Sequence, residues 1–348
     1  MIGKILSVLC FCWSFTAVAY AQEPSSSVRA QEWEAYKERF VAQNGRVIDD
    51  ANGGISHSEG QGYGLILALM SNDRADFERI WTFTHTRLLL RDDGLAVWKW
   101  SPDAEPHVSD PNNASDGDLL IAYALARAGA TWDDARFTEA ARQIATALAD
   151  KAIFEHEGRL LLRPGVAGFG PDDQPDGPIV NLSYWVFEAF PVLAELVPDA
   201  DWEALGRGGL DVARQAGFGD RKLPSDWISV AGDPKPAQGF PAEFSYNALR
   251  IPLYLMRAGL DDMALLRRFR DGMAGANGGV ALVDVSSGEV TEELMDAGYR
   301  IIPALAECVL DGTPLAAELT RFEPTAYYPS TLHLLALAHA REEQQQCL

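Results

Sequence analysis

The sequence from residue 55 to residue 64 reads Ile-Ser-His-Ser-Glu-Gly-Gln-Gly-Tyr-Gly and stands directly before an apolar run that continues to Met70. The run has the three- and four-residue apolar spacing of a helix. Gly60, Gly62 and Gly64 fall in its first turns, and each glycine destabilises a helix by about 1 kcal/mol relative to alanine. We therefore expect a neighbouring helix or a ligand to approach the backbone closely at this helix start.

Two interpretations of Glu59 follow from this stretch. Ser56 with Glu59 fits a capping box, and Ser58 with Gln61 fits one equally well, so Glu59 could serve only to cap the helix. Alternatively, Glu59 is a functional acid held at a helix start. A nucleotide-binding loop is a weaker alternative, because no strand precedes the glycines and no phosphate-binding lysine follows them. The stretch alone leaves both interpretations of Glu59 open.

A second acidic cluster, Asn112 to Asp118, also stands at the start of an apolar helical run. Ser115 as N-cap, with Asp118 three residues later, accounts for one of its two acids. Asp116 is left over, and we expect the helix N-terminus to keep its carboxylate ionised. Glu59 in a drier setting would have a raised pKa and could donate a proton. Two carboxyls whose pKa values are pushed apart are typical of glycosidases.

Helical spacing recurs along the chain, whereas strand signals are few, Val280 to Val285 being the best. Long loops rich in Gly, Pro, Asp and Asn separate the helical segments. We expect helix pairs wound into a solenoid or toroid, with the polar loops, where chemistry usually sits, at the rims. The predicted helices are Trp33–Val41, Tyr63–Met70, Phe77–Leu90, Leu119–Ala128, Phe137–Leu148, Tyr184–Leu196, Trp202–Ala213, Ala248–Met256, Leu294–Val309 and Leu332–Ala340.

Charge and composition narrow the class of ligand. The formal net charge of −21 at pH 7 argues against nucleic acid and anionic lipid, which bind basic surfaces, and is compatible with a neutral polysaccharide. Several tryptophans stand beside loops, including Trp98, Trp100, Trp185 and Trp227. Sugar rings stack on such side chains, although core packing explains most tryptophans. The histidines have no metal-ligand spacing, so neither a metal nor a cofactor is expected.

The N-terminus has the pattern of a secretory signal. Lys4 precedes an apolar stretch that ends at Ala19 and is too short to span a bilayer, and Ala-Tyr-Ala ending at Ala21 has the small residues that signal peptidase reads. We therefore expect a signal peptide over residues 1–21 and an exported product, periplasmic or secreted, with no membrane insertion after cleavage.

The length that remains allows one large domain, because toroids and barrels exceed the usual domain size without splitting. No linker divides the chain, so we expect a single catalytic domain over residues 22–348. Cys308 and Cys347 are the cysteines left after the signal. In an oxidising compartment they either form one disulfide that fixes the C-terminus or remain free thiols.

Short stretches that follow one another in a fixed order carry a resemblance to a known family: Arg46–Asp49, Ser58–Gly64, Ala114–Asp118 with Ile121–Ala122, Ser183–Trp185, Leu223–Trp227 and Tyr246–Arg250. They resemble glycoside hydrolase family 8, the cellulase D family, and especially its endoglucanases associated with bacterial cellulose synthesis. The resemblance implies an all-α fold, the (α/α)6 barrel, which is a toroid of six helical hairpins. It also implies long rim loops, at most a short β-hairpin, and an open substrate cleft across one rim.

The same resemblance implies roles for individual residues. Glu59 looks like the proton donor, and Asp116 looks like the acid at the central sugar subsite. Because the family inverts configuration, a covalent nucleophile is not expected. Tyr184, Trp98 and Arg250 are the expected substrate contacts.

The sequence departs from the family pattern at the general base. Many endoglucanases of the family have Tyr-Asp-Ala and use that Asp, whereas this sequence has Tyr246-Asn247-Ala248. An amide does not accept a proton at neutral pH, so either another carboxylate activates the water or Asn247 orients a water deprotonated from elsewhere. Glu243 is the first candidate, because it would share a face with Asn247 if a helix already runs there. Asp226 and Asp172 come next.

The expected function is that of an inverting endo-β-1,4-glucanase acting on cellulose or a related β-glucan, with association with the cellulose synthesis machinery left open. Lichenan, xylan and chitosan are alternative substrates within the same class. A glycan-binding accessory protein without catalysis is an alternative from another class, raised by Asn247. Retention of Glu59 and Asp116 weighs against it.

Overall fold

The computed structural model describes residues 26–260 and 262–348, which are mainly helical. Five of the α-helices begin after a residue whose side chain caps the first turn, namely His57, Asp73, Asp134, Asp201 and Asp262. In chain order the α-helices are α1 (Ala30–Phe40), α2 (Ser58–Met70), α3 (Arg74–Arg87), α4 (Ser115–Trp132), α5 (Ala135–Lys151), α6 (Ala189–Leu196), α7 (Trp202–Gln215), α8 (Ile251–Arg257), α9 (Met263–Gly272), α10 (Ala297–Asp311) and α11 (Tyr327–Glu343).

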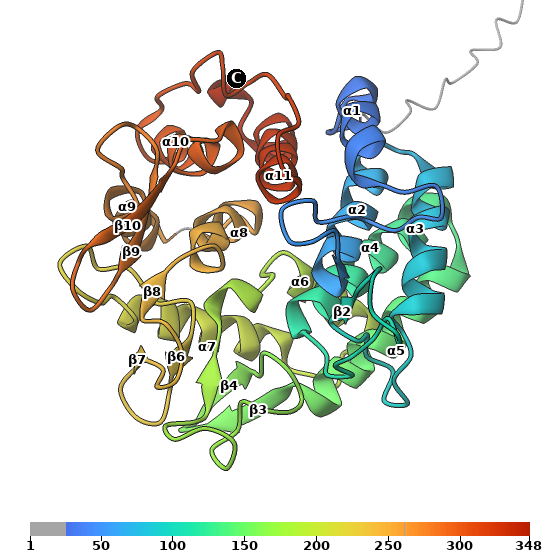
Figure 1. The fold of residues 1–348 in the computed structure, drawn as a ribbon, viewed down its shortest axis with the longest axis horizontal. Helices are drawn as coiled ribbons and strands as arrows, with labels where there is room; N and C mark the ends of the chain where they lie inside the picture. Colours follow the sequence, from blue (N-terminus) through green and yellow to red (C-terminus); the bar gives the residue numbers. More distant parts are fainter. Residues whose placement is uncertain (1–25, 261) are drawn as a thin grey trace, which may run out of the picture.

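The helices are arranged in a ring (Figure 1). Helices α2, α4, α6, α8 and α11 lie nearer its centre, and α3, α5, α7, α9 and α10 lie outside them. Neighbours in sequence pack as pairs, since α2 contacts α3, α4 contacts α5 and α10 contacts α11. Helix α4 also contacts both α2 and α6, and α11 contacts α2, which joins the two ends of the chain. The prediction of a mainly helical chain built from paired helices is confirmed.

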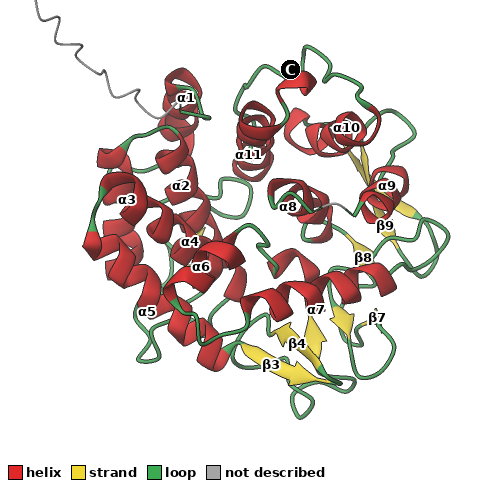
Figure 2. Cartoon of the chain, turned by 180° about the vertical axis from the view of Figure 1, so that it is seen from behind, coloured by secondary structure: helices red, strands yellow, loops and turns green. Residues whose placement is uncertain are grey.

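The expectation of at most a short β-hairpin is wrong. The described residues contain four small antiparallel sheets, several of which lie beside α7 and α9 (Figure 2). Most strands are only two residues long and leave no alternating pattern in the sequence. The strands are β1 (Ser56–His57) with β2 (Lys99–Trp100), β3 (Ile153–His156) with β4 (Arg159–Leu162), β5 (Ile179–Val180) with β6 (Ile228–Ser229) and β7 (Lys235–Pro236), and β8 (Glu243–Phe244) with β9 (Val280–Asp284) and β10 (Val290–Leu294).

Each helix predicted from the sequence overlaps a helix of the structure, with shifted ends. The segment at Tyr184 differs most, because a short 3-10 helix, η1 (Leu182–Tyr184), precedes α6 there. Helix α9 was missed. Its start carries a signal, since Asp262 is a side-chain N-cap that accepts a hydrogen bond from the Leu265 N–H at 3.0 Å. The strand predicted at Val280 is confirmed as β9.

Glycines allow α2 to pack directly against α4. A Cβ on Gly62 would lie 2.5 Å from the Leu120 Cβ, and a Cβ on Gly117 would lie 2.1 Å from the Ser58 Oγ. A Cβ on Gly64 would lie 2.6 Å from the Val47 Cγ2. The expected close approach of a neighbouring helix is confirmed at Gly62. As a result the first turns of α2 and α4 touch.

Three further expectations concern the ends of the chain. Cys308 of α10 and Cys347 form a disulfide with their Cα atoms 5.8 Å apart, which fixes the C-terminal residues to α10. In the described part of the chain no helix is both long enough and apolar enough to cross a membrane. The expected signal peptide, residues 1–21, lies outside the described residues.

The close approach of α2 and α4 predicts the stability of Gly62→Ala. Crowding in a packed core costs roughly 1–3 kcal/mol, more than the helix gains from alanine, so we expect this variant to lower the free energy of unfolding in urea by about 1–2 kcal/mol. The matched control is Gly206→Ala in α7, where an added Cβ meets its nearest atom at an ordinary 3.4 Å. That variant should be unchanged or slightly more stable. Equal stability of the two variants would contradict the packing argument.

Candidate active site

Glu59 is the second residue of α2, and His57 is the N-cap of this helix. The His57 Nδ1 accepts a hydrogen bond from the Gly60 N–H at 2.9 Å, and its Nε2 lies 3.4 Å from the Asp49 Oδ2. His57 therefore does the capping that was expected of a serine. Because His57 accepts the hydrogen bond from the first turn of α2, the Glu59 carboxylate is free for other contacts.

Both capping boxes predicted for α2 are wrong. The Ser56 hydroxyl donates to the Val47 carbonyl, and Gln61 reaches across to the same residue, accepting from the Val47 N–H at 2.6 Å. The Ser58 hydroxyl is buried without a hydrogen-bond partner among the described residues. The polar side chains of this stretch thus fix α2 to the segment before it instead of capping its first turn.

The predicted cap of α4 is also wrong, because Ala114 occupies the N-cap position and Ser115 is the first helical residue. The Ser115 hydroxyl donates to the Arg163 carbonyl at 2.6 Å. The Asp118 carboxylate accepts from the Ala96 N–H at 2.7 Å and from the Asn113 amide at 2.9 Å. Asp116 accepts a backbone hydrogen bond only from the adjacent Gly117 N–H, at 2.8 Å, and its other oxygen contacts Arg250.

Arg250 brings the two predicted acids together. Its Nη1 lies 2.8 Å from the Glu59 Oε2, and its Nη2 lies 2.7 Å from the Asp116 Oδ2. The two carboxyls are close enough for each to affect the pKa of the other. The Arg250 and Asp116 side chains are each only 2% exposed, whereas Glu59 is 17% exposed. Glu59 is therefore the member of the pair that an incoming ligand can reach.

Tyrosines surround this triad of Glu59, Asp116 and Arg250. The Tyr328 hydroxyl accepts from the Arg250 Nη1 at 3.2 Å and donates to the Tyr246 carbonyl at 2.8 Å. The hydroxyls of Tyr63 and Tyr254 hydrogen-bond to each other, and the guanidinium lies 5.9 Å from the centre of the Tyr254 ring. Sequence reasoning missed these residues, although Tyr63 and Tyr254 stand four residues after Glu59 and Arg250, about one helical turn on.

The expected division of pKa values between the two acids is reversed. Burial, together with the negative charge of Glu59, raises the pKa of Asp116 to about 8. Burial alone would raise the pKa of Glu59 too, but the charge of Arg250 lowers it. Only one helix N–H, that of Gly117 at 2.8 Å, hydrogen-bonds to Asp116, which is too little to offset its deeper burial. These opposite shifts favour a state in which the two carboxyls share one proton.

Two of the expected substrate contacts, Trp98 and Tyr184, lie beside the triad. The Trp98 carbonyl accepts from the Ser58 N–H at 3.0 Å, directly before Glu59, and its indole donates to the Asp110 Oδ2 at 2.8 Å. Tyr184 closes η1, next to the Ser183 carbonyl that accepts from the Arg250 Nε at 3.4 Å. Burial and the negative charge of Asp116 raise the pKa of Tyr184.

The prediction that Glu243 and Asn247 share one face of a helix is wrong. Glu243 lies in β8, paired with Asp284, and the 3-10 helix η2 (Ala248–Arg250) begins only after Asn247. Two residues that are four positions apart lie on one face of a helix, but a two-residue strand followed by a turn does not place them so. The carboxylate that does contact Asn247 is Asp226, whose Oδ2 lies 3.2 Å from the Asn247 Nδ2. Asp172 is exposed in the loop before β5.

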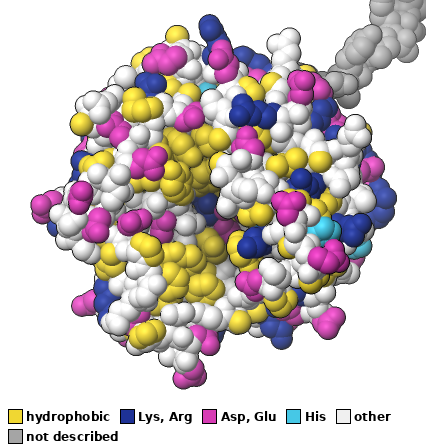
Figure 3. All heavy atoms as spheres, in the orientation of Figure 1, with side chains coloured by type: hydrophobic (Ala, Val, Ile, Leu, Met, Phe, Trp, Pro, Cys, Tyr) yellow, Lys and Arg dark blue, Asp and Glu magenta, His cyan; other side chains and the backbone are white. Residues whose placement is uncertain are grey.

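Two groups of aromatic side chains lie near the triad, one including Tyr184 and the other including Tyr328, which hydrogen-bonds to Arg250. In the first group Trp227 stacks on both Phe169 and Phe240, with ring centres 5.4 and 4.9 Å apart, and Tyr184 meets Trp227 edge-on at 6.2 Å. In the second group the ring of Tyr299 lies 6.2 Å from those of Tyr246 and Tyr328. Figure 3 shows the face of the molecule that is turned to the viewer in Figure 1. This face is hollowed near its centre, with hydrophobic side chains on opposite sides of the hollow.

Comparison with known proteins decides the family. The sequence model named glycosyl hydrolases family 8 matches residues 7–342. The chain belongs to glycosyl hydrolases family 8.

Individual family 8 proteins are similar over different lengths. An endoglucanase of Cellulomonas uda is 40% identical over 64% of this chain and 62% of its own length. A probable endoglucanase of Novacetimonas hansenii is 34% identical over 92% of this chain and 93% of its own. The solved structure of endo-β-1,4-glucanase CMCax from Acetobacter xylinum is 32% identical, with a TM-score of 0.80, and covers 92% of this chain and 99% of that one.

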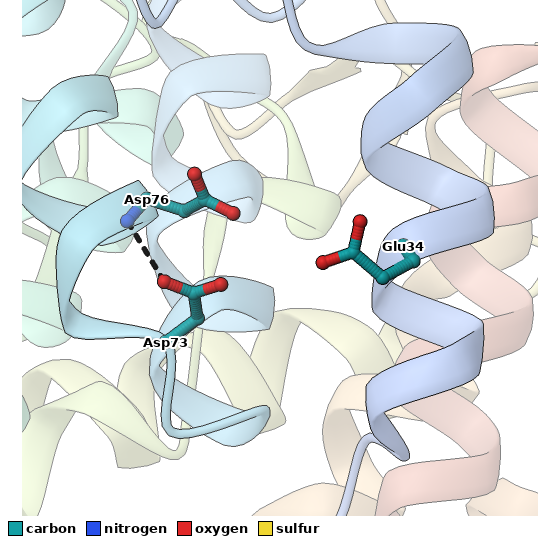
Figure 4. Close-up of side chains that lie close together, drawn as sticks. All are labelled: Glu34, Asp73 and Asp76. Carbon is teal, nitrogen blue, oxygen red and sulfur yellow. Dashed lines mark hydrogen bonds between the residues drawn. The ribbon is translucent and has the colours of Figure 1, made fainter.

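A separate acidic cluster of this family 8 chain, Glu34 with Asp73 and Asp76, has charge partners of its own. Asp73 accepts a hydrogen bond from the Asp76 N–H at 2.9 Å, and Glu34 faces the pair from α1 (Figure 4). The Lys37 Nζ lies 2.6 Å from the Glu34 Oε1 and 2.8 Å from the Asp76 Oδ2. The Lys37 ammonium and the Arg79 guanidinium, which also pairs with Asp76, thus offset two of the three carboxylate charges.

The shared proton predicts the pH dependence of activity. The pKa of Asp116 is raised to about 8, so the pair keeps its proton below that pH and loses it above. We expect kcat/KM for a soluble glucan to fall as the pH rises through about 8. The matched control is Asp118→Asn, which removes another buried acid of α4 with a pKa raised to about 7. If the fall in kcat/KM disappears in Asp118→Asn, the group that titrates is Asp118 and the assignment to Asp116 is wrong.

Proposed function

We propose that the protein hydrolyses internal β-1,4 bonds of a glucan such as cellulose with inversion of configuration, using Glu59 as the general acid. The observation that carries the proposal is the joint contact of Glu59 and Asp116 with Arg250, at 2.8 and 2.7 Å. Glycosidases use such a pair of carboxyls to divide proton donation from charge stabilisation. The endoglucanases among the family 8 relatives support the same activity.

Within this pair Glu59 donates the proton, because it is the more exposed carboxyl, and an acid has to reach the glycosidic oxygen. The one proton that the pair shares passes to Glu59 and from there to the leaving oxygen. Both carboxyls are then ionised while positive charge develops on the sugar ring. Asp116 stabilises that charge, and Arg250 stabilises the two carboxylates.

The two aromatic groups near the triad support cleavage within a chain. Sugar rings stack on aromatic faces, and a ligand that contacts both groups would be a glucan of several sugars. Tyr184 and Trp98 stand beside the acids and contact the sugars nearest to the cleaved bond, while Arg250 acts through the carboxyls. Asn247 orients the hydrolytic water. Glu243 is not proposed as the base, because it lies in β8 and not on a helix with Asn247.

We further propose that the ring of helices is the (α/α)6 barrel of the family and that residues 22–348 form one catalytic domain. The protein is exported after cleavage of residues 1–21, to the periplasm or medium, and could there act beside the cellulose synthesis machinery. The disulfide between Cys308 and Cys347 suits an oxidising compartment. N-terminal sequencing of the exported chain tests the cleavage, and an intact Met1 would contradict it.

Glu59→Gln tests the acid. General acid catalysis contributes roughly 100- to 10,000-fold, so the release of reducing ends from carboxymethylcellulose should fall by that factor. Activity on β-cellobiosyl fluoride should fall far less, because fluoride leaves without strong protonation. The matched control is Glu34→Gln on the exposed face of α1, which should be fully active. A Glu59→Gln protein that keeps more than about a tenth of its activity on the polysaccharide would remove Glu59 as the acid.

A further inference from the structure

Asp226 is a buried carboxylate that holds the segment around Asn247. It is 8% exposed and lies two residues before β6. Its Oδ1 accepts from the N–H groups of Ser245 at 3.0 Å and Ala248 at 2.8 Å. Its Oδ2 accepts from Asn247 twice, from the side-chain Nδ2 at 3.2 Å and from the backbone N–H at 3.4 Å. Both oxygens of Asp226 are thus engaged by one short segment.

The backbone contacts alone would make Asp226 a cap for η2, but the side-chain contact does more. An ionised carboxylate only accepts hydrogen bonds, so the amide must present its Nδ2 to Asp226 and turn its Oδ1 the other way. Among the described residues no side chain or backbone group donates to the Asn247 Oδ1, and this oxygen is not sealed off from solvent. It can therefore accept a hydrogen bond from a water molecule.

Asn247 is connected to the acid pair through a short chain of hydrogen bonds. The carbonyl of the preceding residue, Tyr246, accepts from Tyr328, and the same hydroxyl accepts from Arg250. Arg250 in turn binds Glu59 and Asp116. The segment that carries the amide is thus joined to the acid pair, and Asp226 fixes the position of that segment.

We propose that Asp226 acts through Asn247: it orients the amide toward the hydrolytic water and takes up the proton of that water by way of the amide. This rests on the proposed hydrolysis with Glu59 as the acid. Asp226 is then a positioning residue that also stores the proton, and Asn247 is the group that touches the water. A carboxylate behind the amide thus replaces the missing Asp of the Tyr-Asp-Ala pattern.

The proton transfer balances without any other reactant. The water oxygen forms a bond to the anomeric carbon as the glycosidic bond breaks and Glu59 protonates the leaving oxygen. One water proton moves to the Asn247 Oδ1 while a proton of Nδ2 moves to the Asp226 Oδ2. This leaves the imidic acid form of the amide and a neutral carboxylic acid. The reverse shift, with loss of one proton to solvent, restores both groups.

Burial explains why Asp226 needs the amide. Its four accepted hydrogen bonds and 8% exposure leave little access for a water of its own. Burial also raises the pKa of Asp226, although its hydrogen bonds oppose the shift, and a raised pKa makes the carboxylate a better proton acceptor.

The test compares Asp226→Asn, Asp226→Ser, Asn247→Asp and the two double variants, with Glu243→Gln as the matched control. We expect each Asp226 variant to lose roughly 100-fold or more in kcat with KM changed by less than about threefold. Adding Asn247→Asp should restore at least about a tenth of the activity, because a carboxylate then meets the water directly. Sodium azide, a nucleophile with no proton to lose, should also raise the rate at which Asp226→Asn and Asp226→Ser hydrolyse β-cellobiosyl fluoride. Glu243→Gln should stay close to wild type.

A purely structural cap would give a different result, since neither azide nor Asn247→Asp would restore the lost activity. That outcome overturns the proposal, as do folded Asp226 variants with kcat within about threefold of wild type. If the aspartate variants do not fold, Asn247→Ala decides: retention of wild-type kcat overturns the proposal, and loss with azide recovery supports it. Failure of the proposed hydrolysis gives a different result from failure of the Asp226 proposal. In that case the wild-type protein releases no reducing ends, or Glu59→Gln is as active as wild type.

Discussion

The contact of Arg250 with two carboxyls is the interaction on which the site depends. Asp116 and Arg250 are each 2% exposed, so their charges are largely withdrawn from water and have to be balanced locally. The Arg250 guanidinium balances the charge of one carboxylate, but Glu59 and Asp116 together bring two. A single proton on the pair makes the cluster neutral, which burial favours. In the proposed hydrolysis, this is the proton that passes to the glucan.

The acids meet because two helices start beside each other. The glycines at Gly62 and Gly117 remove the atoms that would hold α2 and α4 apart, and Glu59 and Asp116 each stand at the second position of their helices. These features are local, so the sequence predicts them: glycines crowded into one helix start require a close neighbour, and two acids at apolar helix starts are unusual. The helix positions follow from apolar spacing for the same reason.

Other parts of the site depend on contacts between distant residues, which spacing does not reveal. Arg250 is 134 residues from Asp116, and the sequence predicted it only as a substrate contact. His57 replaced the expected serine cap because Asp49 and Gly60 are both in reach of its ring. Glu243 was misjudged because a two-residue strand, and not a helix, leads to Asn247. The pKa order of the acids was reversed because relative burial is a property of the whole fold.

The number of protons on the acid pair tests this account most directly. A neutron crystal structure of the deuterated protein at pH 7 locates them, because deuterium scatters neutrons strongly. The account predicts one deuteron shared by Glu59 and Asp116, on or near Asp116, with Arg250 fully protonated. A pair that carries no deuteron at this pH would contradict it, because the site would then hold no proton to donate. A deuteron on each carboxyl would contradict it equally, since no carboxylate would remain to stabilise the sugar cation.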